Sequence, residues 1–312
     1  MINTLNQKAK NSTYMKRYLI AAVFLLICKQ SSAQINPFDA LYFQNAYLAN
    51  SAMAGSQEGS RINLGYRNQW SSVPGSPRMQ YVSYETKQNK IGWGLSIINN
   101  REGMVTDNKF LGTFAIHLPL NNPNNQIHLG LNVSAQKLQY NLAGLEGNAA
   151  DQALARFNDR GLIFDGDFGM GFSTERLTLE FASYNLFEQL LKEQTNASIS
   201  NTADFNLFFL AASYRIPMEN WGLTTKLAYR GVKNYTNLVD LAMEFRTRNE
   251  KLAFTGIYHS NKSASFGLSY LHQGKYEFVG FYNTTQNPIS TVANGTFEIG
   301  LKTLLNRKAS KN

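Results

Sequence analysis

The stretch from Gln126 to Gln136 reads QIHLGLNVSAQ, and every second side chain in it is apolar. Successive side chains of an extended strand point to opposite faces, so one face would be apolar and the other polar. The pattern recurs with variations about fourteen times between Arg61 and Leu305, in runs of roughly 10 to 13 residues, a length that crosses a bilayer at a tilt. We therefore predict an all-β fold, a 14-stranded antiparallel transmembrane β-barrel with up-and-down connections.

The same alternation places the individual strands. We expect them at residues 60–70, 78–86, 90–100, 108–119, 125–138, 162–173, 176–186, 204–216, 220–231, 236–247, 251–260, 263–272, 275–284 and 294–305. Several of these segments carry a charge on their polar face, which is intolerable in a buried strand but normal on a wet lumen wall. Four lumen charges are predicted in this way: Asp165, Asp167, Lys226 and Arg230.

The expected connections fall into two classes. The first, third, fifth, seventh, ninth and thirteenth are long, at 71–77, 101–107, 139–161, 187–203, 232–235 and 285–293, whereas the even-numbered ones are tight and the eleventh is a short exception. Outer-membrane barrels have long extracellular loops and short periplasmic turns. Because the strand number is even, we expect both termini on the periplasmic side.

The N-terminal region has the features of a secretory signal peptide. Lys16 and Arg17 precede an uncharged run of about ten residues, too short to span a bilayer as a helix, and residues 31–33 offer a cleavage site before Gln34. Met15 is an alternative start. The expected division is a signal peptide at 1–33, a periplasmic or lumenal segment at 34–59, the barrel at 60–305 and a periplasmic tail at 306–312.

Composition excludes several classes of protein. The only cysteine, Cys28, lies in the predicted signal peptide, so the mature chain would have no disulfide and no cysteine-based site. The sequence has a net charge of +9, but five basic and no acidic residues precede Gln34. The 25 basic and 21 acidic residues that follow give no reason to expect nucleic-acid binding. No 18-residue apolar run follows the signal, which excludes a helical membrane protein.

Little in the sequence suggests catalysis. His117, His128, His259 and His272 lie on different predicted strands or turns without close pairing, so we expect no metal site. No nucleophile elbow, phosphate loop or dinucleotide fingerprint is present. We expect a protein that is not an enzyme and has no cofactor.

Asp165 and Asp167 are the one candidate acid–base pair, because they share a strand face and could raise each other's pKa. The functional interpretation is a hydrolytic carboxylate pair. The favoured interpretation is a lattice of lumen salt bridges with Arg67, Lys226 or Arg230.

The most distinctive residues lie around the start of the first strand. The chain reads NSAMAG over 50–55, YRNQW over 66–70 and PGSP over 74–77. Barrel geometry does not demand this order. We favour a packed motif of plug and strand over a direct partner contact, and both over a chance occurrence. The residues concerned are Asn50, Gly55, Tyr66, Arg67, Gln69, Trp70, Pro74, Gly75 and Pro77.

These segments resemble the start of the PorP/SprF family, outer-membrane proteins of the type IX secretion system in the Bacteroidota. The similarity continues with a Gly-x-Gly strand at 92–94 and with Gly103, whereas Ser51 stands where the family usually has proline. It covers residues 38 to about 104, and the remainder agrees in length and strand pattern.

The resemblance implies a non-enzymatic component that holds or delivers secreted cargo with a C-terminal sorting domain at the cell surface, in gliding bacteria an adhesin. It also implies a periplasmic ring lipoprotein as a partner, and outer-membrane lipid around the barrel. The loops at 139–161 and 187–203 would contact cargo. The alternatives are a channel for small or hydrophobic solutes and, less favoured, an outer-membrane hydrolase.

Overall fold

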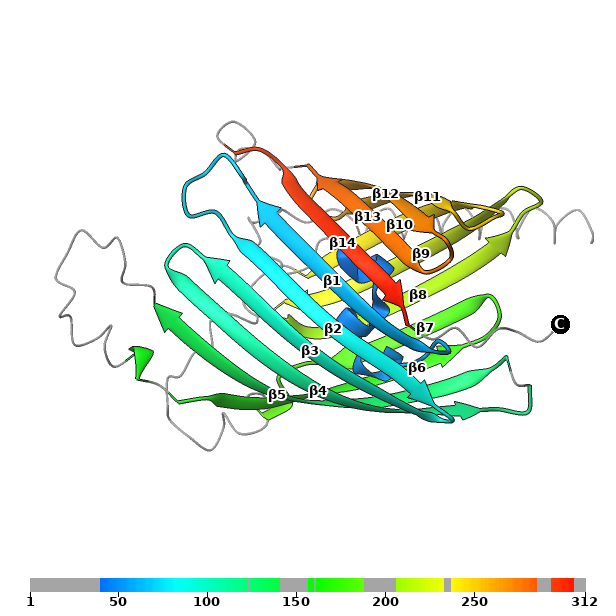
Figure 1. Cartoon of the computed structure of the whole chain (residues 1–312), viewed down its shortest axis with the longest axis horizontal. Coiled ribbons are helices and arrows are strands. Elements are labelled where there is room, and N and C mark those ends of the chain that lie inside the picture. The colour runs from blue at the N-terminus through cyan, green and yellow to red at the C-terminus, as the bar shows by residue number, and fades with distance from the viewer. Residues whose placement is uncertain are drawn as a thin grey trace, which may run out of the picture. The chain divides into compact units, whose positions relative to one another are not determined.

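A computed structural model describes residues 40–122, 124–140, 157–159, 161–187, 206–232, 237–284 and 293–305. Fourteen antiparallel strands close into a barrel in which each strand pairs with its sequence neighbours and β1 pairs with β14 (Figure 1). The strands are β1 (Ser60–Gln69), β2 (Arg78–Gln88), β3 (Ile91–Glu102), β4 (Val105–Pro119), β5 (Gln126–Tyr140), β6 (Ile163–Ser173), β7 (Leu177–Ser183), β8 (Asn206–Pro217), β9 (Trp221–Val232), β10 (Leu238–Thr247), β11 (Leu252–His259), β12 (Ala264–His272), β13 (Tyr276–Asn283) and β14 (Thr296–Leu304). The predicted barrel and its strand number are confirmed.

The alternation seen in the sequence separates the two faces of the wall. On β5, His128 and Ser134 point inward and are buried, whereas Leu131 and Val133 point outward and are 55% and 61% exposed. Outward apolar side chains with similar exposure occur on every strand, as expected for a wall in contact with lipid. Among the described residues, no helix is long and apolar enough to cross a membrane.

The barrel has two rims, which we name by their connections. The loop rim carries the connections at 70–77, 103–104, 141–162, 184–205, 233–237, 260–263 and 284–295, and the turn rim carries those at 89–90, 120–125, 174–176, 218–220, 248–251 and 273–275. The predicted long third connection at 101–107 is wrong. Gly103 adopts a left-handed φ of 59°, so only Gly103 and Met104 separate β3 from β4.

The predicted seventh strand, at 176–186, is too long. It ends at Ser183 because Asn185 has a φ of 54° and the chain turns there. The backbone N–H of Asn185 donates to Asp167 Oδ1 at 3.0 Å, and that of Phe187 donates to Asp165 Oδ1 at 2.8 Å. These bonds secure the turn against β6.

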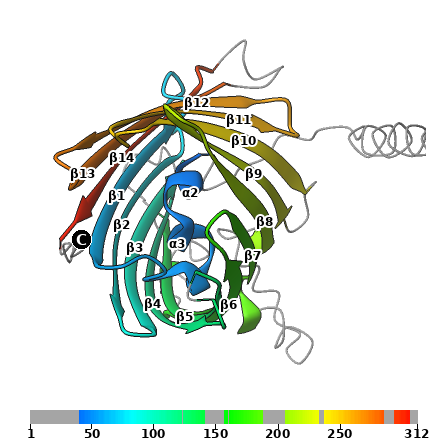
Figure 2. The ribbon, with the colours of Figure 1, turned by 90° about the vertical axis from the view of Figure 1, so that its right-hand side faces the viewer.

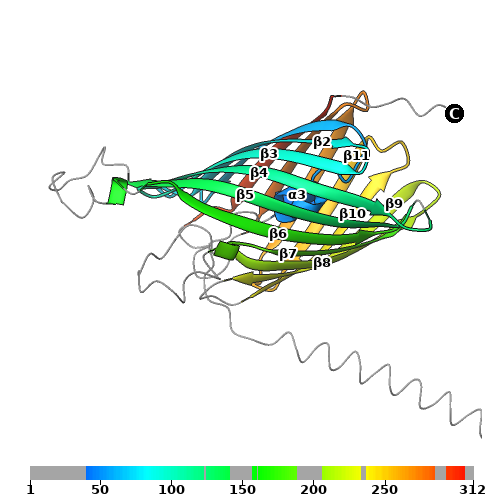
Figure 3. The same ribbon diagram turned by 90° about the horizontal axis from the view of Figure 1, so that it is seen from below.

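The segment before β1 lies inside the barrel. It contains two short helices, α2 (Leu41–Gln44) and α3 (Ala46–Ala49), and a 3₁₀ turn, η1 (Ser51–Met53). Figures 2 and 3 show α3 enclosed by the strands. We call residues 40–55 the plug. The predicted signal peptide, residues 34–39, the tail at 306–312 and most of the longest loops lie outside the described residues.

Glycines on β3, β5 and β6 let the plug approach this part of the barrel closely, and we call it the glycine-lined wall. A Cβ on Gly130 would lie 2.4 Å from the Ala52 nitrogen, and one on Gly169 would lie 2.6 Å from the same atom. On β3, a Cβ on Gly92 would lie 2.0 Å from the Ala54 oxygen. Because most of these neighbours are backbone atoms, a larger side chain would have to displace the plug.

Apolar contacts hold the start of the plug at another part of the wall. Leu41 is buried with inward-facing Tyr81 of β2 and Phe281 of β13. Each of these rings lies over a glycine directly opposite on the neighbouring strand: Tyr81 over Gly65 and Phe281 over Gly267. Glycine here leaves room for the ring, and the ring in turn packs against the plug.

Replacement of Gly130 by valine should therefore destabilise the barrel or expel the plug. We expect a loss of about 1–3 kcal/mol, the usual cost of overpacking. The measurement is the urea midpoint of unfolding in detergent. The matched control is Gly112→Val on the outward face of β4, where nothing lies within 4 Å of an added Cβ. Equal midpoints for the two variants would contradict the close packing of plug against wall.

Candidate functional site in the plugged lumen

Asp240 on β10 is the centre of a buried cluster that binds the plug. It accepts a hydrogen bond from the Tyr42 hydroxyl on Oδ2 at 3.0 Å. Its other partners are Arg230 Nη2 at 2.6 Å and His259 Nδ1 at 2.7 Å. His259 Nε2 lies 2.7 Å from the Ser265 hydroxyl. Four strands and the plug are thus joined through one carboxylate.

Tyr42 is suited to this position because its hydroxyl stays protonated. Burial, and then the charge of Asp240, raise the pKa of the Tyr42 hydroxyl well above its usual value. Two cations face its ring, with Lys226 Nζ 5.5 Å and Arg230 Cζ 5.3 Å from the centroid. The plug therefore contributes both a hydrogen bond and an aromatic surface to the part of the barrel that carries Lys226, Arg230 and Asp240, which we call the charged wall.

Glu298 on β14 binds the first residues of the plug. One carboxylate oxygen accepts the backbone N–H of Ala40 at 3.3 Å and that of Leu41 at 2.9 Å. The other accepts from Asn283 Nδ2 at 2.8 Å and lies 3.7 Å from Arg67 Nε. Glu298 is 1% exposed, so these partners replace the water that it would otherwise need.

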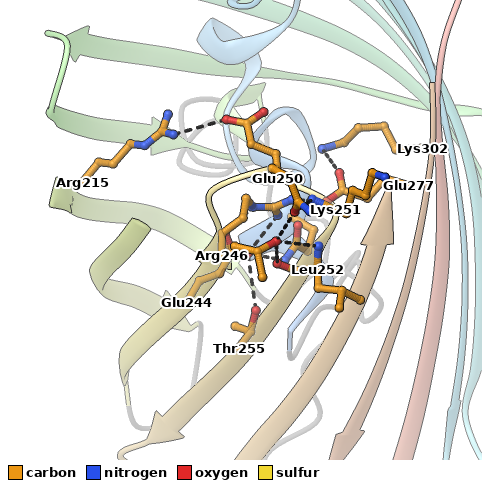
Figure 4. A network of polar contacts seen from close by, with 12 residues as sticks. Arg215, Glu244, Arg246, Glu250, Lys251, Leu252, Thr255, Glu277 and Lys302 are labelled. Atoms are coloured by element: carbon orange, nitrogen blue, oxygen red, sulfur yellow. Dashed lines mark hydrogen bonds and ion pairs between the residues drawn. The ribbon is translucent and has the colours of Figure 1, made fainter. Parts of the chain in front are cut away.

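A third carboxylate, Glu244, joins the plug to a charged network near the turn rim (Figure 4). Gln44 Nε2 donates to Glu244 Oε2 at 2.8 Å, and Arg246 Nε lies 3.0 Å from Glu244 Oε1. Arg246 also contacts Glu277 at 2.8 Å, which in turn lies 3.2 Å from Lys302 Nζ. Positive and negative side chains thus alternate around this half of the lumen.

The glycine-lined wall binds the plug through neutral groups. The Tyr47 hydroxyl lies 2.6 Å from Thr113 Oγ1, and Asn50 Nδ2 donates to the Met170 carbonyl at 3.1 Å. Asn50 Oδ1 also accepts the backbone N–H of Ala52 at 3.0 Å, which caps η1. Asn50 therefore both shapes the plug and attaches it to β6.

His117 and His128 were predicted to be unpaired, and this prediction is wrong. Their Nδ1 atoms lie 2.7 Å apart, because positions 117 and 128 are opposite each other in the β4–β5 register. His117 Nε2 lies 3.0 Å from the Ala54 carbonyl, which can only accept, so His117 Nε2–H donates. With both rings neutral, His128 Nδ1–H donates to His117, and His128 Nε2 accepts from Ser173 Oγ at 2.8 Å. The chain of hydrogen bonds ends on the plug.

The four predicted lumen charges all point inward and are buried, but their partners differ from those expected. Lys226 pairs with Glu180 at 2.8 Å, and Arg230 pairs with Asp240. Asp165 and Asp167 accept backbone amides at the end of β7 instead, and Asp167 also accepts from Asn132 Nδ2 at 3.2 Å. The two aspartates serve as caps for the turn after β7, since the backbone there cannot continue the ladder of β6.

The predicted motif residues are not brought together in one place. Asn50 and Gly55 belong to the plug, where the Gly55 N–H donates to Glu85 Oε2 at 2.8 Å and its φ of 65° suits glycine. Arg67 and Gln69 point into the lumen and are bonded to each other at 2.8 Å, whereas Tyr66 is on the outward face.

The rest of the motif shapes the first loop. Trp70 directly follows β1, and its φ of 53° turns the chain out of the strand. The Gln69 N–H donates to the Pro77 carbonyl at 3.0 Å. Gly75 has a φ of 73° and its carbonyl accepts from Gly103 N–H at 3.0 Å, beside exposed Pro74. The two ends of the motif therefore perform separate structural tasks.

Ser265, His259 and Asp240 stand in the order of a hydrolase relay, which sequence reasoning did not find. All three side chains are at most 3% exposed, and Tyr42 and Arg230 occupy the second oxygen of Asp240. A substrate carbonyl has no approach to Ser265 in this arrangement. The hydrogen bonds from Ser265 through His259 instead fix the carboxylate of Asp240 in the orientation in which it accepts the Tyr42 hydroxyl.

Among the described residues, spaces in the lumen lie on both sides of the plug. A cavity of about 110 Å³ lies toward the loop rim, with Leu48 and Ser51 of the plug and Asp107 and Lys109 of β4 in its lining. A larger space of about 690 Å³ opens toward the turn rim and includes Arg246 in its lining. The plug therefore separates a loop-rim chamber from a turn-rim chamber.

Comparisons with known proteins agree with this architecture. A family model described as type IX secretion system membrane protein PorP/SprF matches residues 31–303. No curated protein matches the sequence.

Similar solved structures include the CymD monoaromatic hydrocarbon channel, with a TM-score of 0.51, 10% identity and coverage of 88% of this chain and 95% of that one. The Pseudomonas putida toluene transporter TodX has a TM-score of 0.47, 10% identity and coverage of 84% and 94%. The Acinetobacter baumannii outer membrane protein Omp33 has a TM-score of 0.44, 8% identity and coverage of 79% and 98%. At such identities the likeness to CymD shows the fold alone. The family match extends over nearly the whole barrel and the plug, and the chain therefore belongs to the PorP/SprF family of type IX secretion system membrane proteins.

Proposed function

We propose that this protein is a non-enzymatic outer-membrane component of type IX secretion that binds or anchors secreted cargo at the cell surface. The cargo is a protein with a C-terminal sorting domain, such as an adhesin in a gliding bacterium. Membership of the PorP/SprF family carries this proposal. In the proposed orientation the loop rim faces the cell exterior, and the turn rim with both termini faces the periplasm.

The plugged lumen supports a role in binding over a role in transport. Residues of the plug are buried between the charged wall and the glycine-lined wall, and four wall carboxylates bind them. A protein that acts through its rims has no need of an open lumen. The long connections at 141–162 and 184–205 are the proposed cargo contacts, and the chamber at the turn rim faces the proposed ring lipoprotein.

A channel for small or hydrophobic solutes is the second candidate function. The structurally similar CymD is described as a monoaromatic hydrocarbon channel, which is the observation that favours this alternative. At 10% identity, however, the similarity shows the fold alone. Cargo recovery and the conductance measured with and without the plug distinguish the two functions.

Cargo binding is tested by affinity isolation from native outer membranes. A tagged copy should recover a secreted protein with a C-terminal sorting domain, identified by mass spectrometry. A variant with residues 142–156 replaced by a glycine–serine linker of equal length should lose most of this cargo. The control carries the same kind of replacement at 286–291, also on the loop rim. Recovery of no secreted protein and no secretion component from the unmodified chain would refute the proposal.

Channel activity is tested by conductance in planar bilayers. The intact protein should show no steady single-channel openings because the plug closes the lumen. A variant with residues 40–55 replaced by a glycine–serine linker should conduct, since a 14-stranded wall without a plug encloses an aqueous space. Steady conductance of the intact protein, equal to that of the variant, would favour the channel.

A further inference from the structure

The outward face of β2–β5 changes character toward the loop rim. Val82, Ile97 and Phe110 face each other across β2, β3 and β4 and are 47–51% exposed. The next outward residues lie two positions further along each strand, about 7 Å away. From there to the loop rim the outward side chains of this face are polar. We call six of them the loop-rim patch: Arg78, Gln80, Asn99, Arg101, Asn108 and Lys137.

The loop-rim patch lies beyond the apolar belt of these strands, on the side of the loop rim. The row of Val82, Ile97 and Phe110 belongs to the apolar belt, and headgroup regions begin where such a belt ends. The register places Gln80, Asn99, Asn108 and Lys137 in the next row. Arg78 and Arg101 form the row beyond it, closer to the rim.

Two like charges face each other in this outer row. Arg78 and Arg101 are directly opposite in the β2–β3 register, and both are exposed. Like charges at such positions destabilise a sheet. Within the part of the chain that the structure describes, neither guanidinium has a carboxylate at ion-pair distance. An anion between them would relieve the repulsion.

The surrounding groups fit a phosphate. The six residues of the loop-rim patch include three cations and no carboxylate. Asn99 Nδ2 donates to Asn108 Oδ1 at 2.7 Å, which aligns the two amides side by side across the strands. Arginine forks bind phosphate oxygens in pairs, and neighbouring amides add single donors.

We propose that the loop-rim patch binds the phosphate groups of a membrane lipid whose acyl chains lie on the apolar row of Val82, Ile97 and Phe110. The same outward face carries cations near the loop rim and apolar side chains next to them on the side of the turn rim. This arrangement matches a lipid, with its charged headgroup and acyl chains, rather than the surface of a soluble protein. The site itself is independent of cargo binding. The choice between the two leaflets of the membrane is the one part that rests on the proposed function. In the proposed orientation the loop rim faces the cell exterior, so the ligand is a phosphorylated glycolipid of the outer leaflet.

The test is lipid retention by the purified full-length protein. Lipopolysaccharide from the native outer membrane is added in mixed micelles, and bound lipid is counted by native mass spectrometry. The double variant Arg78→Gln, Arg101→Gln should retain about tenfold less, the effect of losing a charge-assisted contact. The control is Arg176→Gln, an exposed arginine at the turn rim, which should retain as much as the unmodified chain.

Three outcomes would overturn this assignment. Unchanged retention in the double variant would show that the arginines do not bind lipid. Displacement of the lipid by an excess of inorganic phosphate alone would indicate a site for a free anion. Loss of cargo with lipid retained would assign the loop-rim patch to a protein partner. Misfolding does not confuse the test, because removing the opposed charges should leave the urea midpoint equal or higher.

Discussion

Four carboxylates on the lumen wall, those of Glu85, Asp240, Glu244 and Glu298, accept hydrogen bonds from the plug, and the interior of the barrel depends on these contacts. Each carboxylate is at least nine-tenths buried. A buried carboxylate without partners would cost several kcal/mol, and the arginines beside Asp240, Glu244 and Glu298 supply only part of what these carboxylates need. Tyr42, Gln44 and backbone amides at both ends of the plug supply the remainder. Wall and plug are therefore one folded unit.

The opposite wall contributes shape rather than charge. Gly92, Gly130 and Gly169 leave space that the plug backbone fills, and Asn50 and His117 then bind it with neutral groups. The plug thus lies between a wall that attracts it and a wall that accommodates it. Under the proposed function, cargo, other secretion components and lipid would bind at the rims and on the outer surface, without passing through the lumen.

The sequence predicts the wall better than the site. Period-two alternation placed all fourteen strands, because lipid on one side and polar groups on the other impose it on each strand. It missed the pairing of His117 with His128, since their contact requires the β4–β5 register. The attachment of Tyr42 to Asp240 joins residues 198 positions apart, which local patterns do not encode. The early end of β7 depends on Asp165 and Asp167 as caps, a role that alternation cannot distinguish from a lumen charge.

Hydrogen exchange of the plug, followed by mass spectrometry on the protein in detergent micelles, tests the central claim most directly. If the plug is fixed between the two walls, the backbone amides of Leu41, which donates to Glu298, and Ala52, which donates to Asn50, should exchange as slowly as those of β5 and β6. Exchange of residues 40–55 within seconds, at the rate of an open chain, would contradict a plug that is part of the folded barrel.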